Sequence, residues 1–282
     1  MYFEIIFSKI AQRRVAINKQ LLESFETQAE IEKIMTPFYF SLHQGIYAAR
    51  YGQAIIVLDS NKDKYISLVE KAAAYFEMVC QNEFVYEQNI YKAAFPIKDC
   101  DEKQLNYWIK EFTQKGFISQ SYSKNRKSIA EASLRKGGLS DYKWDFKSSW
   151  KPFSQISKWE IAKAFFQLVK VRRLIKKGGL SVLLDLVEKT SHVSIQVPTK
   201  EKLNELAAAV DAATILYPKK TYCLAWATTF VLLALKKRWK CYLVIGIQTN
   251  PFYAHAWAEC ADEVINDDPS VAEVLSIILK KP

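Results

Sequence analysis

One stretch near the C-terminus, residues 222–268, constrains the fold most, because its hydrophobic pattern changes from helical to strand-like. A largely apolar run of 13 residues begins at Cys223 and predicts a buried helix. After a basic turn, residues 242–248 predict a buried strand. Over residues 254–259, Ala alternates strictly with larger side chains, which predicts a second strand. A helix followed by a β-hairpin is therefore expected here.

Three residues of this stretch carry the groups of a cysteine nucleophile, its base and the group that orients the base. Cys223 lies in the first turn of the expected helix, for which Thr221 is a candidate cap. There the free N–H groups and the helix dipole favour the thiolate and offer donors to an oxyanion. His255 lies on the second strand, and Asp267 follows it by 12 residues. Each residue alone is more often structural, but the combination predicts a Cys–His–Asp triad.

The register of the hairpin decides which aspartate faces His255. A loop of odd length centred near Ala261 places Asp267 directly opposite His255, on the same face of the sheet. A loop of even length places Asp268 there instead. We expect Asp267 to be the third member of the triad, with Asp268 as the alternative.

Three short strands followed by two helices predict a small winged-helix-like domain at residues 39–120. The strands are expected at 45–50, 53–59 and 64–68, and the helices at 69–80 and from Asp101, a candidate cap, to Gly116. Such a domain reads DNA through a basic helix or binds a peptide as an added strand. The last helix is charge-balanced and has no Arg, so we expect a peptide and not a nucleic acid.

The third strand and the last helix of this domain are expected to form the peptide groove. Its expected binding residues are Lys64, Tyr65, Ile66 and Leu68 on the strand and Leu105, Trp108 and Phe112 on the helix.

The rest of the chain completes an α+β class protein. Residues 1–38 predict a helical extension, and residues 121–149 are polar and irregular, as in a linker. Residues 150–282 predict a C-terminal domain in which further helices, one of them at 200–216, precede the site. The motif Lys-Gly-Gly-Leu-Ser occurs twice, at 136–140 and 177–181, but neither copy continues as a phosphate-binding loop.

Composition bears on the number of domains, on cysteine chemistry and on the cellular compartment. A chain of 282 residues accommodates two domains, and its net charge of +10 is spread among 30 acidic residues, which favours a solvated surface. Five cysteines without a CxxC pair predict neither a disulfide framework nor a zinc site. The N-terminus lacks the order of a secretory signal, and no apolar run is long enough to span a bilayer. We expect a cytoplasmic protein without membrane association.

Two sets of motifs resemble a known family. The run YAARYGQAIIVLDSNKDKYISL, at 47–68, resembles the peptide-recognition element of enzymes that process ribosomally made peptides. Cys-Leu at a helix start, LVIG at 243–246, PFYAHAWAE at 251–259 and VINDD at 264–268 resemble the lasso-peptide B proteins. The sequence departs from that pattern at 260–263, where a glycine-containing turn is usual.

The resemblance implies a fused leader-recognition element and a transglutaminase-like cysteine peptidase of papain-like fold. It implies that Cys223 is the nucleophile, His255 the base and Asp267 the orienting group. The implied partners are a lasso precursor peptide and an asparagine-synthetase-like cyclase. Some members depend on ATP, but no nucleotide motif is present here, so no cofactor is assigned. A transglutaminase-type acyl transferase and a non-catalytic leader-binding adaptor remain alternatives.

Overall fold

The chain folds into two compact units, which do not follow the order of the sequence. The computed structural model describes residues 36–87, 89–98, 100–123, 127–130, 156–191, 196–249, 251–265 and 267–282. The smaller unit contains Met1–Ser41 and Tyr75–Arg126, and the larger unit contains Leu42–Ala74 and Lys127–Pro282. The helix predicted for residues 1–38 and most of the predicted linker at 121–149 lie outside the described residues.

The smaller unit is built around a four-stranded sheet with the order β6-β5-β1-β7. Its elements are β1 (Phe38–Leu42), β5 (Glu83–Glu87), β6 (Ile90–Ala93), β7 (Ile118–Ser121), most of α2 (Glu70–Gln81) and α3 (Glu102–Gln114). Phe76 of α2 packs edge-to-face on Phe112 of α3, with ring centroids 4.9 Å apart. The Asp101 side chain accepts hydrogen bonds from the N–H groups of Lys103 and Gln104, so the predicted cap is confirmed.

The three strands predicted between residues 45 and 68 are confirmed, but they belong to the larger unit. They are β2 (Ile46–Tyr51), β3 (Ala54–Asp59) and β4 (Lys64–Leu68), antiparallel in the order β2-β3-β4. Ile56 and Leu58 of β3 are buried in one hydrophobic core with residues of α4 and α6. The compact units therefore divide the chain differently from the domains expected at 39–120 and 150–282, because this sheet packs with the C-terminal helices.

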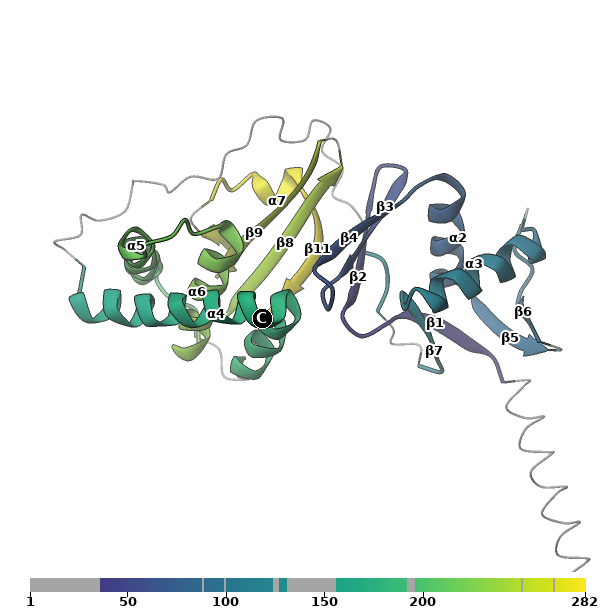
Figure 1. Ribbon diagram of the computed structural model, residues 1–282, viewed down its shortest axis with the longest axis horizontal. Helices are drawn as coiled ribbons and strands as arrows, with labels where there is room; N and C mark the ends of the chain where they lie inside the picture. Colours follow the sequence, from purple (N-terminus) through teal and green to yellow (C-terminus); the bar gives the residue numbers. More distant parts are fainter. Residues whose placement is uncertain are drawn as a thin grey trace, which may run out of the picture. The chain divides into compact units, whose positions relative to one another are not determined.

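Three helices form the middle of the larger unit. They are α4 (Lys158–Thr190), α5 (Lys200–Leu216) and α6 (Cys223–Lys236), and Figure 1 shows them gathered beside the C-terminal sheet. Helix α6 is buried along almost its whole length, as its apolar sequence predicts. The indole N–H of Trp226 donates a 2.7 Å hydrogen bond to Asp211 of α5, which satisfies a buried donor between the two helices.

The C-terminal sheet has the strand order β10-β9-β8-β11. Its strands are β8 (Cys241–Thr249), β9 (Phe252–Cys260), β10 (Glu263–Ile265) and β11 (Ser276–Lys281), and α7 (Val271–Val274) precedes the last. Ala256 and Ala258 of β9 face the core shared with α6, whereas Trp257 packs with Val271 and Leu275 on the opposite face. The predicted alternation of β9 is thus confirmed, and small Ala side chains allow the helix to approach the sheet.

Sequence reasoning missed several short elements. The strands β1, β5, β6 and β7, the one-turn helix α7 and the edge strand β11 were not expected. Each is short, and a run of four to six residues carries too little periodicity to separate a strand from a loop. The predicted α+β class nevertheless stands.

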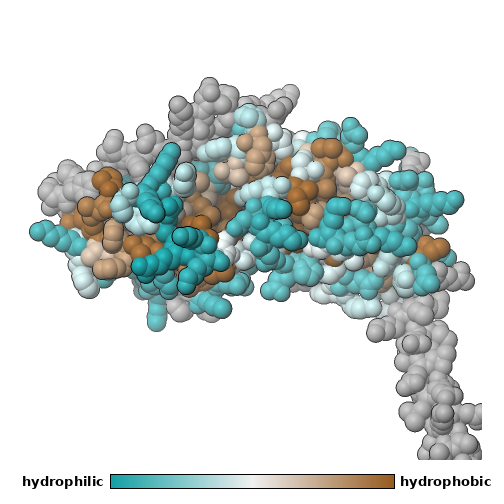
Figure 2. Space-filling view, viewed as in Figure 1, coloured by the Kyte–Doolittle hydropathy of each residue, from teal (hydrophilic) through white to brown (hydrophobic). Residues whose placement is uncertain are grey.

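The visible surface is mostly hydrophilic, with separate apolar patches among charged side chains (Figure 2). Within the described ranges, no helix combines the length and the apolar character needed to cross a bilayer.

Candidate active site

Cys223 occupies the first position of α6, as the sequence predicts. The residue before it, Tyr222, is the N-cap, and its side chain makes no capping hydrogen bond. The prediction that Thr221 caps this helix is wrong, because its buried hydroxyl has no hydrogen-bond partner among the residues that the structure describes. Neither Tyr222 nor Thr221 therefore caps the first turn of α6 with its side chain.

The thiol of Cys223 is more buried than its helix-terminal position suggested. Burial raises its pKa, while hydrogen-bonding backbone groups of Ala256, Leu224 and Cys223 itself act in the opposite direction. The backbone hydrogen bonds at the helix start do lower the pKa of the thiol, as expected, but the larger effect of desolvation raises it. A resting thiol of this kind needs a neighbouring base to become a nucleophile.

His255 lies in the middle of β9, opposite Gly246 of β8, and is 1% exposed. Its ring is held between Tyr253 and Trp257, with centroids 5.9 and 6.0 Å away and planes within 20° of parallel. Its Nε2 is 2.5 Å from Oδ2 of Asp267, and its Nδ1 is 3.4 Å from the hydroxyl of Tyr253. Asp267 therefore engages Nε2, and the Tyr253 hydroxyl lies beside Nδ1.

Asp267 reaches His255 by a route that the register argument did not foresee. The turn at Ala261 and Asp262 has two residues, both with positive φ (54° and 62°), and Cys260 pairs with Glu263. Continued in this register, the ladder would place Asp268 opposite His255. However, β10 ends at Ile265, and beyond it Asp267 supplies the carboxylate that contacts the imidazole.

Asp268, the alternative partner, forms hydrogen bonds with residues next to it in the chain. Its backbone N–H donates a 2.8 Å hydrogen bond to Oδ1 of Asp267. Its own Oδ1 accepts hydrogen bonds from the backbone N–H and hydroxyl of Ser270, at 2.9 and 2.7 Å. Asp268 therefore supports the Asp267 carboxylate through the main chain and shapes the turn that leads into α7.

Burial governs the protonation of the His255–Asp267 pair. Loss of hydration lowers the pKa of His255 to about 4. The same effect raises the pKa of Asp267 to about 7, with the N–H of Asp268 lowering it and the Asp268 charge adding to the rise. At neutral pH the imidazole is consequently neutral and able to accept a proton.

Cys223 of α6 and His255 of β9 are both among the residues that line one cavity of about 240 Å³. The cavity wall is mainly apolar and consists of Leu58, Asp63, Tyr65, Ile175, Leu180, Cys223, Leu224, Ile245, Ala254, His255 and Ala256. The structure thus places Cys223 and His255 in the wall of one cavity, with Asp267 bonded to the His255 imidazole.

The residues predicted to bind a peptide fall in both units. On β4, Lys64 is exposed, Tyr65 and Ile66 are half-buried and Leu68 is buried. On α3, Leu105 and Phe112 are each 1% exposed. Both side chains therefore pack inside the smaller unit and present almost no surface to a peptide. Trp108 is half-buried, and its indole N–H has no partner among the described residues.

Two features near the cavity escaped sequence reasoning. Tyr253 was not singled out, although its alternation with His255 along the strand puts the two side chains on one face. Tyr65 was assigned to peptide binding, yet it lines the cavity of Cys223 and its ring lies 5.5 Å from that of Phe252. The contact between Tyr65 of β4 and Phe252 of β9 joins residues far apart in the chain, so it could not be predicted from a local sequence pattern.

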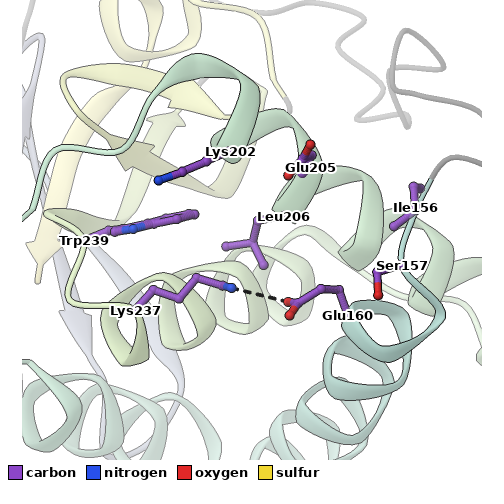
Figure 3. Close-up of a pocket in the computed structure, with 8 residues that line it drawn as sticks. All are labelled: Ile156, Ser157, Glu160, Lys202, Glu205, Leu206, Lys237 and Trp239. Atoms are coloured by element: carbon purple, nitrogen blue, oxygen red, sulfur yellow. Dashed lines mark ion pairs between the residues drawn. The ribbon is translucent and has the colours of Figure 1, made fainter.

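A larger cavity of about 470 Å³ lies elsewhere on the same unit (Figure 3). In it, Lys237 forms an ion pair with Glu160 at 3.4 Å, and Lys202 and Trp239 lie nearby. It contains none of the predicted site residues. Across the described ranges, no group of three His, Cys, Asp or Glu side chains is arranged to hold a metal ion.

Comparison with known proteins places the site in a recognised domain. Residues 165–280, which include Cys223, His255 and Asp267, match the transglutaminase-like superfamily. The chain is also 37% identical over 59 residues to the microcin J25-processing protein McjB of Escherichia coli. That match covers 21% of this chain and 28% of the other protein. No solved structure matches the chain.

Proposed function

This chain carries a transglutaminase-like domain and resembles the lasso-peptide B proteins, and from this premise we propose that it is a cysteine peptidase that removes the leader of a lasso-peptide precursor. The observation that carries the proposal is the arrangement at one cavity of the Cys223 thiol and the His255 imidazole, with Asp267 bonded to the latter. A thiol and a neutral imidazole that line one cavity, with a carboxylate bonded to the imidazole, are the groups that nucleophilic acyl chemistry requires.

The first step is acylation of Cys223. His255 takes the Sγ proton at Nδ1, and the sulfur adds to the scissile carbonyl carbon. Asp267, holding the Nε2 side of the ring, stabilises the imidazolium that forms. Backbone N–H groups at the start of α6, those of Cys223 and Leu224, lie next to Sγ and stabilise the negative oxygen of the tetrahedral intermediate.

The second step releases both products. The imidazolium returns its proton to the departing amine as the C–N bond breaks, which leaves the leader as a thioester on Cys223. Water, deprotonated by His255, then attacks the thioester, and Sγ is released and protonated again. These steps use only the chain's own groups and water, so we expect cleavage without added nucleotide.

We place the leader along the open edge of β4. In the described sheet β4 has a hydrogen-bonded neighbour on one side only, since the strand order is β2-β3-β4. An extended peptide can therefore add as a further strand, with side-chain pockets giving selectivity. Because Tyr65 of β4 also lines the cavity of Cys223, a peptide held there has its cleavage site close to the nucleophile.

The test is leader removal from the purified precursor by the Cys223→Ala variant. We expect cleavage to be abolished, while Cys100→Ala, which removes a partly exposed thiol elsewhere, retains it. Cleavage that persists in Cys223→Ala would refute the proposal. Binding of the leader by a wild-type protein that never cleaves it would favour the adaptor alternative.

Acyl transfer to an amine is the second candidate, because the transglutaminase-like domain is compatible with the same thioester. The mass of the products separates the two reactions: hydrolysis adds one water, whereas amide transfer releases ammonia. We further propose that the freed core peptide passes to an asparagine-synthetase-like cyclase. Co-purification of the two proteins, or cleavage that becomes faster when the cyclase is added, would support that partnership.

A further inference from the structure

The wall of the Cys223 cavity is not built by the transglutaminase-like segment alone. Leu58 of β3, Asp63 of the β3–β4 turn and Tyr65 of β4 lie about 100 residues before the segment matched at 165–280, yet they line the cavity. Leu58 is completely buried in the core shared with α4 and α6, so the sheet is a fixed part of this wall.

A kink in α4 joins the sheet to the cavity. Gly179 has φ 63° and interrupts the helix, and the backbone N–H of Leu180 donates a 2.8 Å hydrogen bond to Oδ1 of Asp63. A side chain at position 179 would collide with the Asp63 carboxylate, so only glycine fits both the conformation and the space. Asp63 thereby caps the second half of α4 from a distant strand turn and fixes Leu180 in the wall.

The wall of the cavity is mainly hydrocarbon. Leu58, Ile175, Leu180, Leu224 and Ile245 present hydrocarbon. Asp63, whose Oδ1 accepts the N–H of Leu180, is an exposed residue and the one acidic side chain among the lining residues.

Burial keeps the Tyr65 phenol neutral, because loss of hydration raises its pKa to about 12. An acidic side chain entering this cavity would lose its hydration and meet the Asp63 carboxylate, whereas an apolar one would gain contact with the hydrocarbon wall.

We propose that this cavity is the specificity pocket of the enzyme and binds an apolar side chain of the substrate next to the scissile bond. Tyr65 and Ile175 are the half-buried wall residues that limit the size of that side chain. The proposal rests on the proposed peptidase function, since it assigns Cys223 as the reacting group. It means that the sheet expected to hold the leader also selects the residue that is cleaved.

The experiment uses the full chain and acetylated tripeptidyl fluoromethyl ketones, which label a reactive thiol. The residue at either of the two positions before the warhead is varied among Gly, Val, Leu, Phe, Asp and Lys. The rate of labelling at Cys223 is measured by mass spectrometry. At one of the positions we expect Val or Leu to react about tenfold faster than Gly and faster than Lys, and Asp to react more slowly than Gly.

Pocket variants test the wall directly. Tyr65→Ala and, as a smaller change, Ile175→Ala should reduce the discrimination against Phe several-fold relative to Leu. Tyr47→Ala is the matched control, because Tyr47 is a half-buried tyrosine of β2 packed on the same core but outside the cavity. It should keep the wild-type order of rates.

The outcomes separate the two proposals. Equal labelling rates for Leu, Asp and Lys, or an unchanged order in both pocket variants, would overturn the pocket. An apolar preference in labelling without any leader removal would overturn the peptidase function and leave the pocket standing. Failure of every probe to label Cys223 would overturn both.

Discussion

The carboxylate of Asp267 controls which nitrogen of His255 can act as the base. When it is ionised, it accepts the Nε2 proton, so the lone pair that takes the proton of Cys223 is on Nδ1. When it is protonated, it donates to Nε2, and the imidazole then carries its own proton on Nδ1. Since burial raises the pKa of Asp267 to about 7, this choice falls within the neutral range.

We therefore expect kcat/KM for leader removal to rise as pH increases through about 7, where Asp267 loses its proton. Asp267→Asn should lower kcat by roughly 10²–10⁴-fold, because the amide favours the wrong tautomer, and should remove this limb of the profile. Asp268→Asn should retain most activity and move the limb to lower pH, because the Asp268 charge raises the pKa of Asp267. An equal loss in both variants would make Asp268 an essential member of the site.

The same two groups make opposite contributions to stability. Between pH 4 and 6.5 the unfolded chain binds a proton at His255 that the folded chain does not, so stability rises with pH. Between pH 3.8 and about 7 the folded chain retains a proton on Asp267 that the unfolded chain has lost, so stability falls with pH. The wild-type protein should show a shallow net dependence across pH 4–6.5.

Urea unfolding of Asp267→Asn checks this balance. With the aspartate contribution removed, the free energy of unfolding should increase from pH 4 to 6.5 and level off above it. A profile for the variant as shallow as that of the wild type would show that His255 titrates normally in the folded protein.

At the scale of elements, the β9–β10 hairpin sets the position of Asp267. Its two-residue turn has positive φ at both Ala261 and Asp262, the geometry of a type I′ turn, without the usual glycine. Left-handed backbone costs about 1–2 kcal/mol at a residue that carries a side chain. The departure at 260–263 from the glycine-containing pattern therefore changes the strain in the turn and does not prevent the hairpin.

Replacing Asp262 with Gly should relieve that strain and raise the free energy of unfolding by about 1 kcal/mol, measured by thermal or urea denaturation. The register should be unchanged, since the turn length is the same. Lys219→Gly is the control: this exposed loop residue does not have positive φ, so the substitution should be neutral or destabilising. Destabilisation by Asp262→Gly would mean that the aspartate side chain, and not the backbone, maintains the turn.

At the scale of the whole molecule, the larger unit is discontinuous in sequence. Ala49, Ile56 and Leu58 of the β2–β3 hairpin share one core with the helices around Cys223. The predicted domain at 150–282 omits this hairpin, and its removal would expose part of the apolar core to water.

We expect a fragment of residues 150–282 to unfold at a markedly lower temperature than the full chain, or without cooperativity. Joining residues 42–74 to it through a flexible linker should restore cooperative unfolding, as followed by circular dichroism. A fragment of residues 150–282 that melts at the same temperature as the full chain would show that the sheet adds nothing to this core.

Much of the chemistry could be predicted because it depends on local patterns. The apolar run after Cys223 required a buried helix, and the strict Ala alternation around His255 required a strand with that side chain on one face. The cap at Asp101 followed from local hydrogen bonding. The motifs that resembled the lasso-peptide B proteins are confirmed as a resemblance by the transglutaminase-like match and the partial match to McjB.

Tertiary structure decided what depends on contacts distant in sequence. The observed pairing of β9 with β10, if continued, would place Asp268 opposite His255. Because β10 ends at Ile265, Asp267 makes the contact with His255 instead. Desolvation by surrounding elements reversed the expected shift of the Cys223 thiol. The packing of β3 and β4 beside α4 brought Tyr65 to the cavity. The sequence by itself thus determined which groups are present and on which faces, whereas burial and the meeting of remote segments determined their protonation, partners and pocket.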